Sequence, residues 1–330
     1  MATRKRTATK AKTLVIDAGN GNVKVNLAGE SELIPSLLSN NNGAYIRGGF
    51  SLGDESWILG WDNYNRPDKK AVADSSTGKL DYLHLMLAGS LSAMSHLLTP
   101  GDKLDLHLLT LNSDKRNTLE QAVEKATADL SIDGEPMKLQ AHLARVYPEG
   151  VGASLYAASV FPCVPRVSVL DFGNGTLNLA QYFIGNPSKP RRENFSFVPC
   201  GVQKLVALTS DLLTQETTNG SVDENLVRQA LDTNSYRYLD SYQGRDIWTT
   251  CAKATEAWLE LSKVKLLLTQ AVRSLASGIP VVCVGGGFSL HIVQQMVTEA
   301  LASQGSRELI HIPSNPLTVG VDGLYEVLQP

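Results

Sequence analysis

The sequence is poor in the features that identify disulfide-rich, zinc-binding and membrane-spanning proteins. It has only four cysteines, at positions 163, 200, 251 and 283, and none forms the close Cys pair that a zinc site or a disulfide framework uses. No apolar run approaches the roughly 18 residues that a membrane-spanning helix needs. We therefore expect a cytoplasmic chain whose cysteines are reduced and pack as small apolar residues.

The sequence also lacks two familiar nucleotide-binding motifs. It contains no GxxxxGK[ST] phosphate loop and no GxGxxG that leads from a strand into a helix. These absences argue against a P-loop ATPase and against a Rossmann dehydrogenase. A nucleotide site in this chain would need a different pattern.

A surplus of basic residues is absent as well, because the formal net charge of the 330 residues is -3. This value argues against a protein that coats nucleic acid. Residues 1–12 nevertheless carry five Lys and Arg side chains and no acidic one, so the remaining chain is acidic, at -8. We expect a disordered basic tail over 1–12 before a globular body. A solvated tail and an electrostatic tether to DNA or an acidic partner both fit this composition.

The most informative feature that is present is an internal repeat. Residues 14–28 read LVIDAGNGNVKVNLA and residues 168–182 read SVLDFGNGTLNLAQY, so that Asp17 aligns with Asp171, 154 residues later. Each copy is an apolar strand, an Asp, a Gly-Asn-Gly turn and a second strand. Asn-Gly favours a tight hairpin turn because both residues tolerate positive φ. The repeat predicts a duplicated fold in which a hairpin opens each half.

The repeated hairpin suits phosphate binding. Backbone N–H groups of a glycine-rich turn can approach phosphate oxygens closely. An Asp at the strand end would repel phosphate unless a divalent cation, held largely through water, lay between them. Lys24 occurs only in the first copy, where Asn178 is its counterpart, and it would contact phosphate from one side. A single copy would also fit a structural hairpin, but the duplication favours a phosphate site.

A third glycine element lies near the C-terminus. Residues 279–284 (IPVVCV) predict a buried strand that ends in three glycines, Gly285–Gly287, before a helical segment from Phe288. In α/β proteins, ligands bind on backbone at the carboxyl end of such a strand. Three consecutive glycines are costly in chain entropy, so we expect close packing or a close ligand there.

Glu149 is a candidate catalytic carboxylate. It lies in Tyr147-Pro148-Glu149-Gly150, directly before a helix of small residues. One interpretation is a carboxylate that interacts favourably with the N-terminus of that helix. The other is a carboxylate that orients or deprotonates an attacking water. The sequence leaves both open.

The remaining periodicity predicts alternating strands and helices, and hence an α/β architecture. Apolar alternation predicts a strand over 104–111. Helical spacing predicts helices over 116–130, 202–214, 222–231 and 251–277. In the last of these, Trp258 and its apolar neighbours are expected to be core, and the lysines at 253, 263 and 265 to be solvated. Residues 40–80 follow no motif and are expected to form a variable subdomain surface.

These motifs, in this order, resemble the actin-like ATPase superfamily and, within it, the ParM-type plasmid-segregation actins. The superfamily's phosphate-1 pattern D-x-G-x-x-x-x-K is similar to residues 17–24, and its phosphate-2 pattern D-x-G-x-x-T to residues 171–176. The adenosine motif resembles Gly285–Gly287, and the second connecting motif resembles residues 315–320. Pro148-Glu149 resembles the Pro-Glu pair that positions the hydrolytic water in ParM-type members. Asn178 departs from the Asp that many members have there.

The resemblance covers about residues 13–330 and implies a fold. This is the α/β actin-like fold, a duplicated RNase H-like arrangement of two domains with a nucleotide in the interdomain cleft. Domain I would span 13–160 and domain II 161–330. The C-terminal helix, about 317–328, would pack back on domain I.

The resemblance also implies a site for ATP and Mg²⁺, with GTP as the alternative nucleotide. Glu149, Asp17, Asp171 and Lys24 would form the catalytic set, and the two Asp residues would hold the metal largely through water. The residues expected to contact the nucleotide come from three elements: Gly19, Asn20, Gly21, Asn22 and Lys24; Gly173, Asn174, Gly175 and Thr176; and Gly285, Gly286, Gly287 and Phe288.

The function implied by the resemblance is that of a cytoplasmic ATPase whose hydrolysis is coupled to filament formation. Its partners would be further copies of itself and a DNA-bound adaptor of ParR type through which it segregates plasmids. Neither direct sequence-specific DNA binding nor membrane association is expected. Two alternatives stay open: a small-molecule kinase of the same superfamily, and a non-hydrolysing nucleotide-gated scaffold.

Overall fold

The structure is a computed structural model that describes residues 10–40, 49–63, 66, 68–72, 79–110, 114–185, 189–216, 221–239, 244–303 and 305–329. The chain divides into two compact units. Unit 1 is Met1–Gly152 with Gly320–Pro330, and unit 2 is Ala153–Val319. The sequence placed this division at residue 160, whereas the two units meet along the chain at Gly152. The C-terminal residues from Gly320 belong to unit 1.

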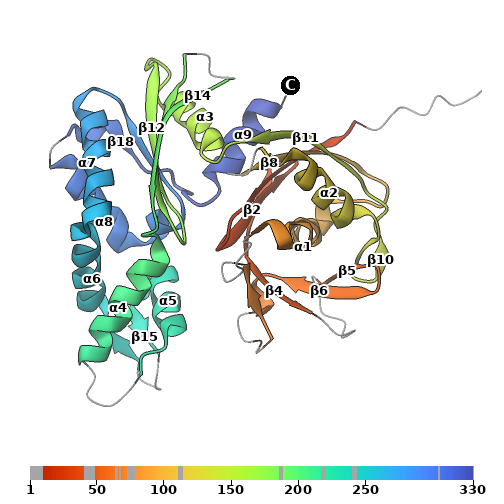
Figure 1. Cartoon of the computed structure of the whole chain (residues 1–330), viewed down its shortest axis with the longest axis horizontal. Helices are drawn as coiled ribbons and strands as arrows, with labels where there is room; N and C mark the ends of the chain where they lie inside the picture. Colours follow the sequence, from red (N-terminus) through yellow and green to blue (C-terminus); the bar gives the residue numbers. More distant parts are fainter. Residues whose placement is uncertain are drawn as a thin grey trace, which may run out of the picture. The chain divides into compact units, whose positions relative to one another are not determined.

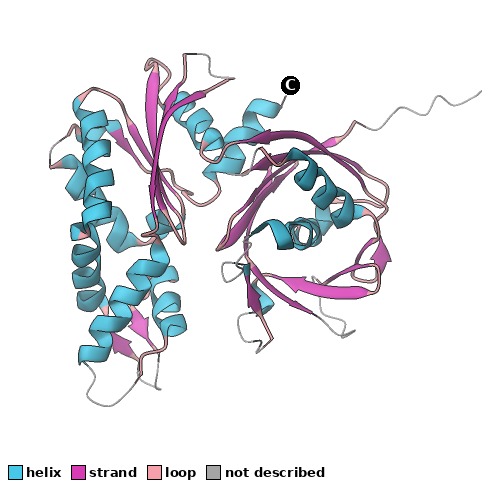
Figure 2. Cartoon of the chain, viewed as in Figure 1, coloured by secondary structure: helices cyan, strands magenta, loops and turns pink. Residues whose placement is uncertain are grey.

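Unit 1 contains a mixed sheet and an antiparallel sheet, with helix α1 (Lys79–Ala93) packed on strands of both (Figures 1 and 2). In sheet order, the strands of the mixed sheet are β11 (Gln140–Tyr147), β8 (Lys103–Leu109), β1 (Lys12–Ala18), β2 (Asn22–Leu27) and β3 (Glu30–Pro35). The strands of the antiparallel sheet are β10 (Glu135–Pro136), β9 (Leu130–Ile132), β5 (Phe50–Leu52), β6 (Glu55–Leu59), β4 (Leu37–Asn40) and β7 (Lys70–Ala71).

The other helical elements of unit 1 are α2 (Arg116–Thr127), α9 (Val319–Leu328), η1 (Trp61–Asn63) and η3 (Ser95–Leu97). The described parts of residues 40–80 contribute strands and η1 to the antiparallel sheet and its edge. Strand β8 confirms the predicted strand over 104–111. Helix α2 ends three residues earlier than predicted, because Leu130 is the first residue of β9.

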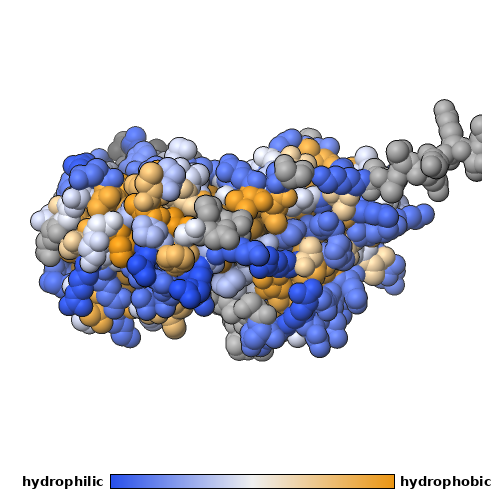
Figure 3. Space-filling view, turned by 90° about the horizontal axis from the view of Figure 1, so that it is seen from above, coloured by the Kyte–Doolittle hydropathy of each residue, from blue (hydrophilic) through white to orange (hydrophobic). Residues whose placement is uncertain are grey.

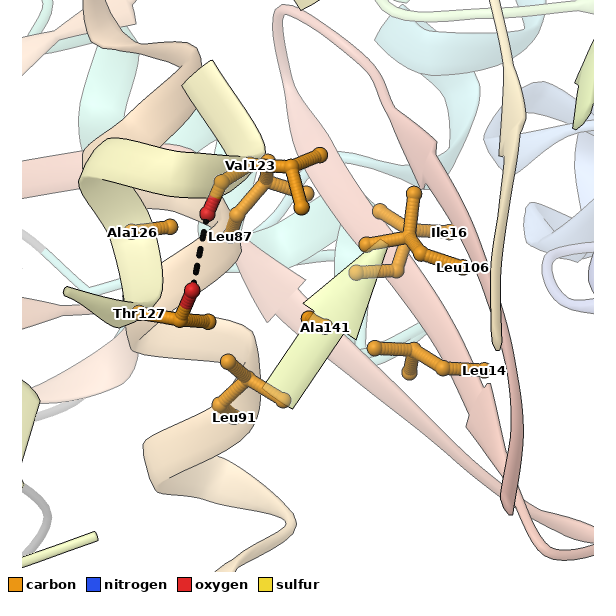
Figure 4. Close-up of a pocket in the computed structure, with 9 residues that line it drawn as sticks. All are labelled: Leu14, Ile16, Leu87, Leu91, Leu106, Val123, Ala126, Thr127 and Ala141. Carbon is orange, nitrogen blue, oxygen red and sulfur yellow. Dashed lines mark hydrogen bonds between the residues drawn. The ribbon is translucent and has the colours of Figure 1, made fainter. Parts of the chain in front are cut away.

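The core of unit 1 lies between the mixed sheet, α1 and α2 (Figure 4). Alternate residues of β1 point into it, because successive side chains of a strand face opposite sides. A small gap in this core is lined by Leu14, Ile16, Leu87, Leu91, Leu106, Val123, Ala126, Thr127 and Ala141. The Thr127 hydroxyl donates to the Val123 carbonyl at 3.1 Å. The lining is therefore apolar with its one hydroxyl satisfied, which is packing rather than a ligand site.

Unit 2 is built on a five-stranded mixed sheet. Its strands, in sheet order, are β14 (Arg191–Val198), β13 (Leu177–Phe183), β12 (Arg166–Phe172), β17 (Val281–Val284) and β18 (Ile310–His311). A two-stranded sheet is formed by β15 (Arg237–Tyr238) and β16 (Arg245–Asp246). The helical elements are α3 (Val151–Val160), α4 (Val202–Glu216), α5 (Glu224–Asp232), α6 (Trp248–Glu260), α7 (Ser262–Ala276), η4 (Gly286–Ser289), α8 (His291–Ala302) and η5 (Arg307–Leu309).

In unit 2, α6, α7 and α8 cover one face of the sheet and α3 lies on the other (Figure 1). The predicted core role of Trp258 is confirmed, because its ring is fully buried and stacks on Phe172 at 4.5 Å. The lysines at 253, 263 and 265 are exposed, as predicted. The predicted helix over 251–277 is wrong as a single element, since Leu261 adopts an extended conformation (ψ 126°) between α6 and α7.

All four cysteines are free thiols. Three of them, Cys200, Cys251 and Cys283, are buried, and Cys163 is exposed. Burial raises the pKa of Cys251 to about 12, with a smaller contribution from Asp246, and burial also raises the pKa of Cys283. The buried thiols therefore pack as apolar groups. Within the described part of the chain, no helix is long and apolar enough to span a bilayer.

The expected tail is shorter than predicted at its C-terminal end. Lys12 is the first residue of β1, and its ammonium contacts the Asp102 carboxylate at 2.6 Å. Lys12 is therefore part of the folded unit, because it is held by a tertiary ion pair. Residues 1–9 of the expected tail lie outside the described residues.

Candidate functional site

The two repeated hairpins have the same register. In unit 1, β1 pairs with β2 so that Asp17 lies opposite Lys24. In unit 2, β12 pairs with β13 so that Asp171 lies opposite Asn178. The alignment made from the sequence repeat therefore holds in three dimensions within each unit, including the replacement of Lys24 by an Asn.

Both predicted hairpins are present, and a four-residue loop separates the last paired residues of each. In the first, the Gly19 N–H donates to the Asn22 carbonyl at 3.1 Å, and in the second the Gly173 N–H donates to the Thr176 carbonyl at 2.9 Å. No residue of either loop has positive φ. The tolerance of Asn-Gly for positive φ is therefore not used here, because a four-residue loop closes the hairpin without the left-handed conformations that a two-residue turn requires.

In unit 1, Asp17 and Lys24 form a partly buried ion pair. The Lys24 ammonium lies 2.8 Å from the Asp17 carboxylate, and the two side chains are 19% and 15% exposed. The loop beside them is fixed by Ser36, whose hydroxyl donates to the Gly19 carbonyl at 2.7 Å and whose N–H donates to the Gly21 carbonyl at 3.0 Å. A carboxylate, an ammonium and a glycine loop thus lie at the same end of the hairpin.

Glu149 lies at the same edge of the mixed sheet as Asp17. The parallel pairing places Asp17 beside Leu109 of β8, and Leu109 beside Tyr147 of β11, two residues before Glu149. The Glu149 carboxylate accepts a hydrogen bond from the Lys79 ammonium at 2.6 Å, and both side chains are at least four-fifths buried. A cation supplied by α1 therefore holds this carboxylate, although none is near it in sequence.

In unit 2, the phosphate-2 hairpin and the triple glycine lie side by side. Parallel pairing puts Asp171 beside Val284, the residue before Gly285. A Cβ at Gly285 would lie 2.3 Å from a carboxylate oxygen of Asp171, and its φ is +93°. Only glycine fits there, because its bare backbone leaves room for the Asp171 side chain. The Gly285 N–H donates to the Pro316 carbonyl at 2.8 Å, which joins the second connecting segment to this site.

The rest of the triple-glycine element is packed against the core. A Cβ at Gly287 would lie 2.1 Å from the Phe172 ring. Phe288 was predicted to contact the nucleotide, but its side chain is fully buried and meets Phe172 edge-on at 6.3 Å. Only the backbone of Phe288 is left to face a ligand. At Gly287 the glycine serves close packing, which the sequence could not distinguish from ligand approach.

The phosphate-2 loop has two supports that sequence reasoning missed. The Arg228 guanidinium of α5 donates to the Asn174 side-chain oxygen at 2.5 Å. The Gly201 N–H donates to the Gly175 carbonyl at 3.1 Å, and a Cβ at Gly201 would collide with the Asn174 carbonyl. A Cβ at Gly175 itself would meet nothing within 4 Å, so this part of the loop is open. Arg228 brings positive charge to a loop that is expected to hold phosphate.

The side chains present fit a phosphate and a hard cation. Both hairpins combine a glycine loop with a strand-end carboxylate, and carboxylate oxygens are ligands that suit Mg²⁺. Among the described residues no group of three or more His, Cys, Asp or Glu side chains could hold a metal ion. In each unit, the strand-end Asp could hold Mg²⁺ through water, and phosphate oxygens could supply further ligands whose charge the cation offsets.

No protein-family model matches the chain. No curated protein matches it in sequence. Similarity is found among solved structures. The 15-stranded ParM filament from Clostridium botulinum is 14% identical, with a TM-score of 0.67 over 96% of this chain and 99% of that chain.

The archaeal actin homologue Ta0583 is 17% identical, with a TM-score of 0.71 over 96% of this chain and 98% of that chain, and its complex with ADP also matches, with a TM-score of 0.67. The MamK double helical filament is 13% identical, with a TM-score of 0.65 over 97% of this chain and all of that chain. This chain therefore has the α/β actin-like fold with duplicated mixed sheets.

Proposed function

We propose that this chain is a cytoplasmic ATPase that binds ATP with Mg²⁺, assembles into filaments and hydrolyses ATP within them. By this proposal it moves DNA, such as a plasmid, through a DNA-bound adaptor of ParR type. The observation that carries the proposal is the duplicated hairpin, in which a strand-end Asp and a glycine loop recur at the same register in each unit. Similar solved structures include two filaments and a complex with ADP.

Each candidate residue receives one role under this proposal. The glycine loops at 19–22 and 173–176 bind phosphate oxygens through backbone N–H groups. Asp17 and Asp171 hold the cation through water, and Lys24 exchanges its contact with Asp17 for one with phosphate. Glu149 accepts a proton from the attacking water or orients it, and Lys79 keeps the Glu149 carboxylate in place.

Sedimentation and phosphate release, measured together with and without ATP and Mg²⁺, test the proposal. Pelleting that requires ATP, accompanied by phosphate release, supports an assembling ATPase. ADP formation that requires an added sugar or acid acceptor, with the phosphoryl group found on the acceptor and no phosphate released, supports the kinase alternative. ATP binding with neither pelleting nor release supports the nucleotide-gated scaffold.

The role of Glu149 gives the first specific prediction. Glu149→Ala should slow phosphate release about a hundredfold or more, as loss of a general base does, while ATP binding and pelleting persist. Lys79→Met is the matched control, because it breaks the same ion pair but retains the carboxylate. It should slow release less than Glu149→Ala. Equal release from wild type and Glu149→Ala would remove Glu149 from the catalytic set.

A further inference from the structure

Strand β14 exposes an unusual aromatic surface at the edge of the unit 2 sheet. It has one neighbour in the sheet, β13. The side chains of Phe195 and Phe197 are 37% and 62% exposed and stack on each other at 6.0 Å. Exposed aromatic side chains on an open edge are typical of a strand that pairs with another chain.

The first half of β14 is basic. Arg191 and Arg192 are exposed, and the Arg192 guanidinium lies over the Phe195 ring at 4.8 Å. Glu193, the one acidic residue of the strand, pairs with Arg166 at 2.8 Å and with Arg191 at 3.3 Å, so it offsets one of three nearby positive charges and leaves the region basic. The pairing of β14 with β13 is irregular in this half of β14, where its register shifts between Asn194 and Arg192. The basic half would repel a second β14, so the edge is suited to an acidic partner.

An edge of the required charge exists on the same chain. The edge strands of four or more residues in the described sheets are β3, β11 and β14. Strand β11 carries His142 and Arg145, whereas the charged residues of β3 are Glu30 and Glu32, both exposed, with the Glu30 carboxylate 3.1 Å from the His96 imidazole. Among these edges, β3 alone has only acidic charges. It is also the topological counterpart of β14, since each is the third strand of its unit's hairpin repeat.

We propose that β14 of one copy pairs with β3 of a second copy, and that this contact drives the self-assembly proposed above, on which the inference rests. Because the two surfaces differ, the contact is heterologous, and a pair of copies retains one free β3 on the first copy and one free β14 on the second. Such a contact propagates into a filament unless it closes into a ring. The opposite charges of β3 and β14 determine which strands pair between copies, and the two Phe side chains of β14 add apolar contact. Figure 3 shows that hydrophobic and hydrophilic residues are interspersed on the face in view.

Charge reversal tests the contact. Variant X carries Arg191→Glu and Arg192→Glu, and variant Y carries Glu30→Lys and Glu32→Lys. Each variant alone places like charges across the contact and should raise the critical concentration for ATP-dependent pelleting roughly tenfold or more. An equimolar mixture of X and Y should pellet again, because each strand of X then meets a complementary strand of Y. Lys253→Glu with Lys263→Glu, which changes the net charge as X does but lies on α6 and α7, should pellet like wild type.

The outcomes separate this contact from the proposed function. Wild-type protein that never pellets with ATP and Mg²⁺ would overturn both the assembly and the contact. Wild-type pelleting with normal pelleting of X and Y alone would overturn the contact and leave the function standing. Loss of pelleting in X and Y without recovery in the mixture would overturn the pairing of β3 with β14. Thermal stabilisation of X and Y by ATP verifies that both variants are folded.

Discussion

At the scale of single residues, the Lys12–Asp102 pair holds the first residue of β1 against unit 1. The Lys12 ammonium donates to Asp102 at 2.6 Å and to the Leu97 carbonyl at 2.7 Å, and the Asp102 side chain is 12% exposed. Burial alone would raise the pKa of Asp102. Hydrogen bonds from Lys12 and Thr99 outweigh burial and lower the pKa below its ordinary value. Ionised Asp102 therefore stabilises the folded state.

Lys12→Met should lower the free energy of unfolding by about 1 kcal/mol at neutral pH. Because the pKa of Asp102 is depressed by folding, the stabilisation is present above the unfolded pKa of about 4 and is lost as the pH falls through the folded pKa. The difference between wild type and variant in urea unfolding should therefore shrink below about pH 4. Lys10→Met, two residues earlier at an exposed position, is the matched control. A difference that does not change with pH would contradict this account.

Single residues also show which contacts could not be predicted from the sequence. The Asp and glycine positions of both hairpins could be predicted because they lie within a few residues of one another and occur twice. Lys79 and Glu149 are 70 residues apart, and Arg228 and Asn174 are 54 apart. No local spacing rule connects such pairs, because they come together only through the packing of α1 and α5. Local patterns therefore predicted the loops but missed the cations beside them.

At the scale of elements, two glycines of unit 1 that are far apart in the sequence, Gly152 and Gly320, approach each other closely. A Cβ at Gly152 would lie 1.7 Å from the Gly320 carbonyl oxygen, a contact with backbone that no rotamer can relieve. A Cβ at Gly320 would meet nothing within 4 Å. The two glycines are therefore not equivalent, although they lie side by side.

Gly152→Ala should destabilise unit 1 by about 2 kcal/mol, because the backbone at Gly320 must move to admit the methyl group. Gly320→Ala should be neutral or stabilise by about 0.5 kcal/mol, since Ala restricts the unfolded chain more than Gly does. Urea unfolding of the two variants measures both values. Equal stability of the two variants would contradict the close approach at Gly152.

The helices that were predicted incorrectly have a physical explanation in their packing. The predicted helix over 251–277 contains no Gly or Pro before residue 278, so its sequence offers no breaker. The buried residues of the two helices nevertheless do not lie on one face of a single continuous helix. Trp258 and Val264 are both buried, but they lie six residues apart. A continuous helix would bring the same face back after about seven residues. The break at Leu261 restores the alignment of both apolar faces with the core.

At the scale of the whole molecule, each unit carries its own copy of the hairpin that we propose binds phosphate, and the two sets of candidate site residues differ. Unit 1 has Lys24 and Glu149, and unit 2 has the glycine-rich element and Arg228. The proposed site requires one nucleotide to be bound by residues of both units. Unit 2 alone, with its hairpin and Gly285, is the competing site, and hydrogen exchange distinguishes the two.

If both hairpins bind one ATP with Mg²⁺, exchange of the stable amides of both units should slow about a hundredfold at an ATP concentration near a hundred times Kd. Asp17→Asn should abolish this protection in unit 2 as well as in unit 1, because the proposed cation loses one of the two carboxylates that hold it. Asp54→Asn, at an exposed turn of unit 1, should leave it intact. Protection of unit 2 that survives Asp17→Asn would mean that unit 2 binds the nucleotide alone, and Lys24 and Glu149 would then have no part in hydrolysis.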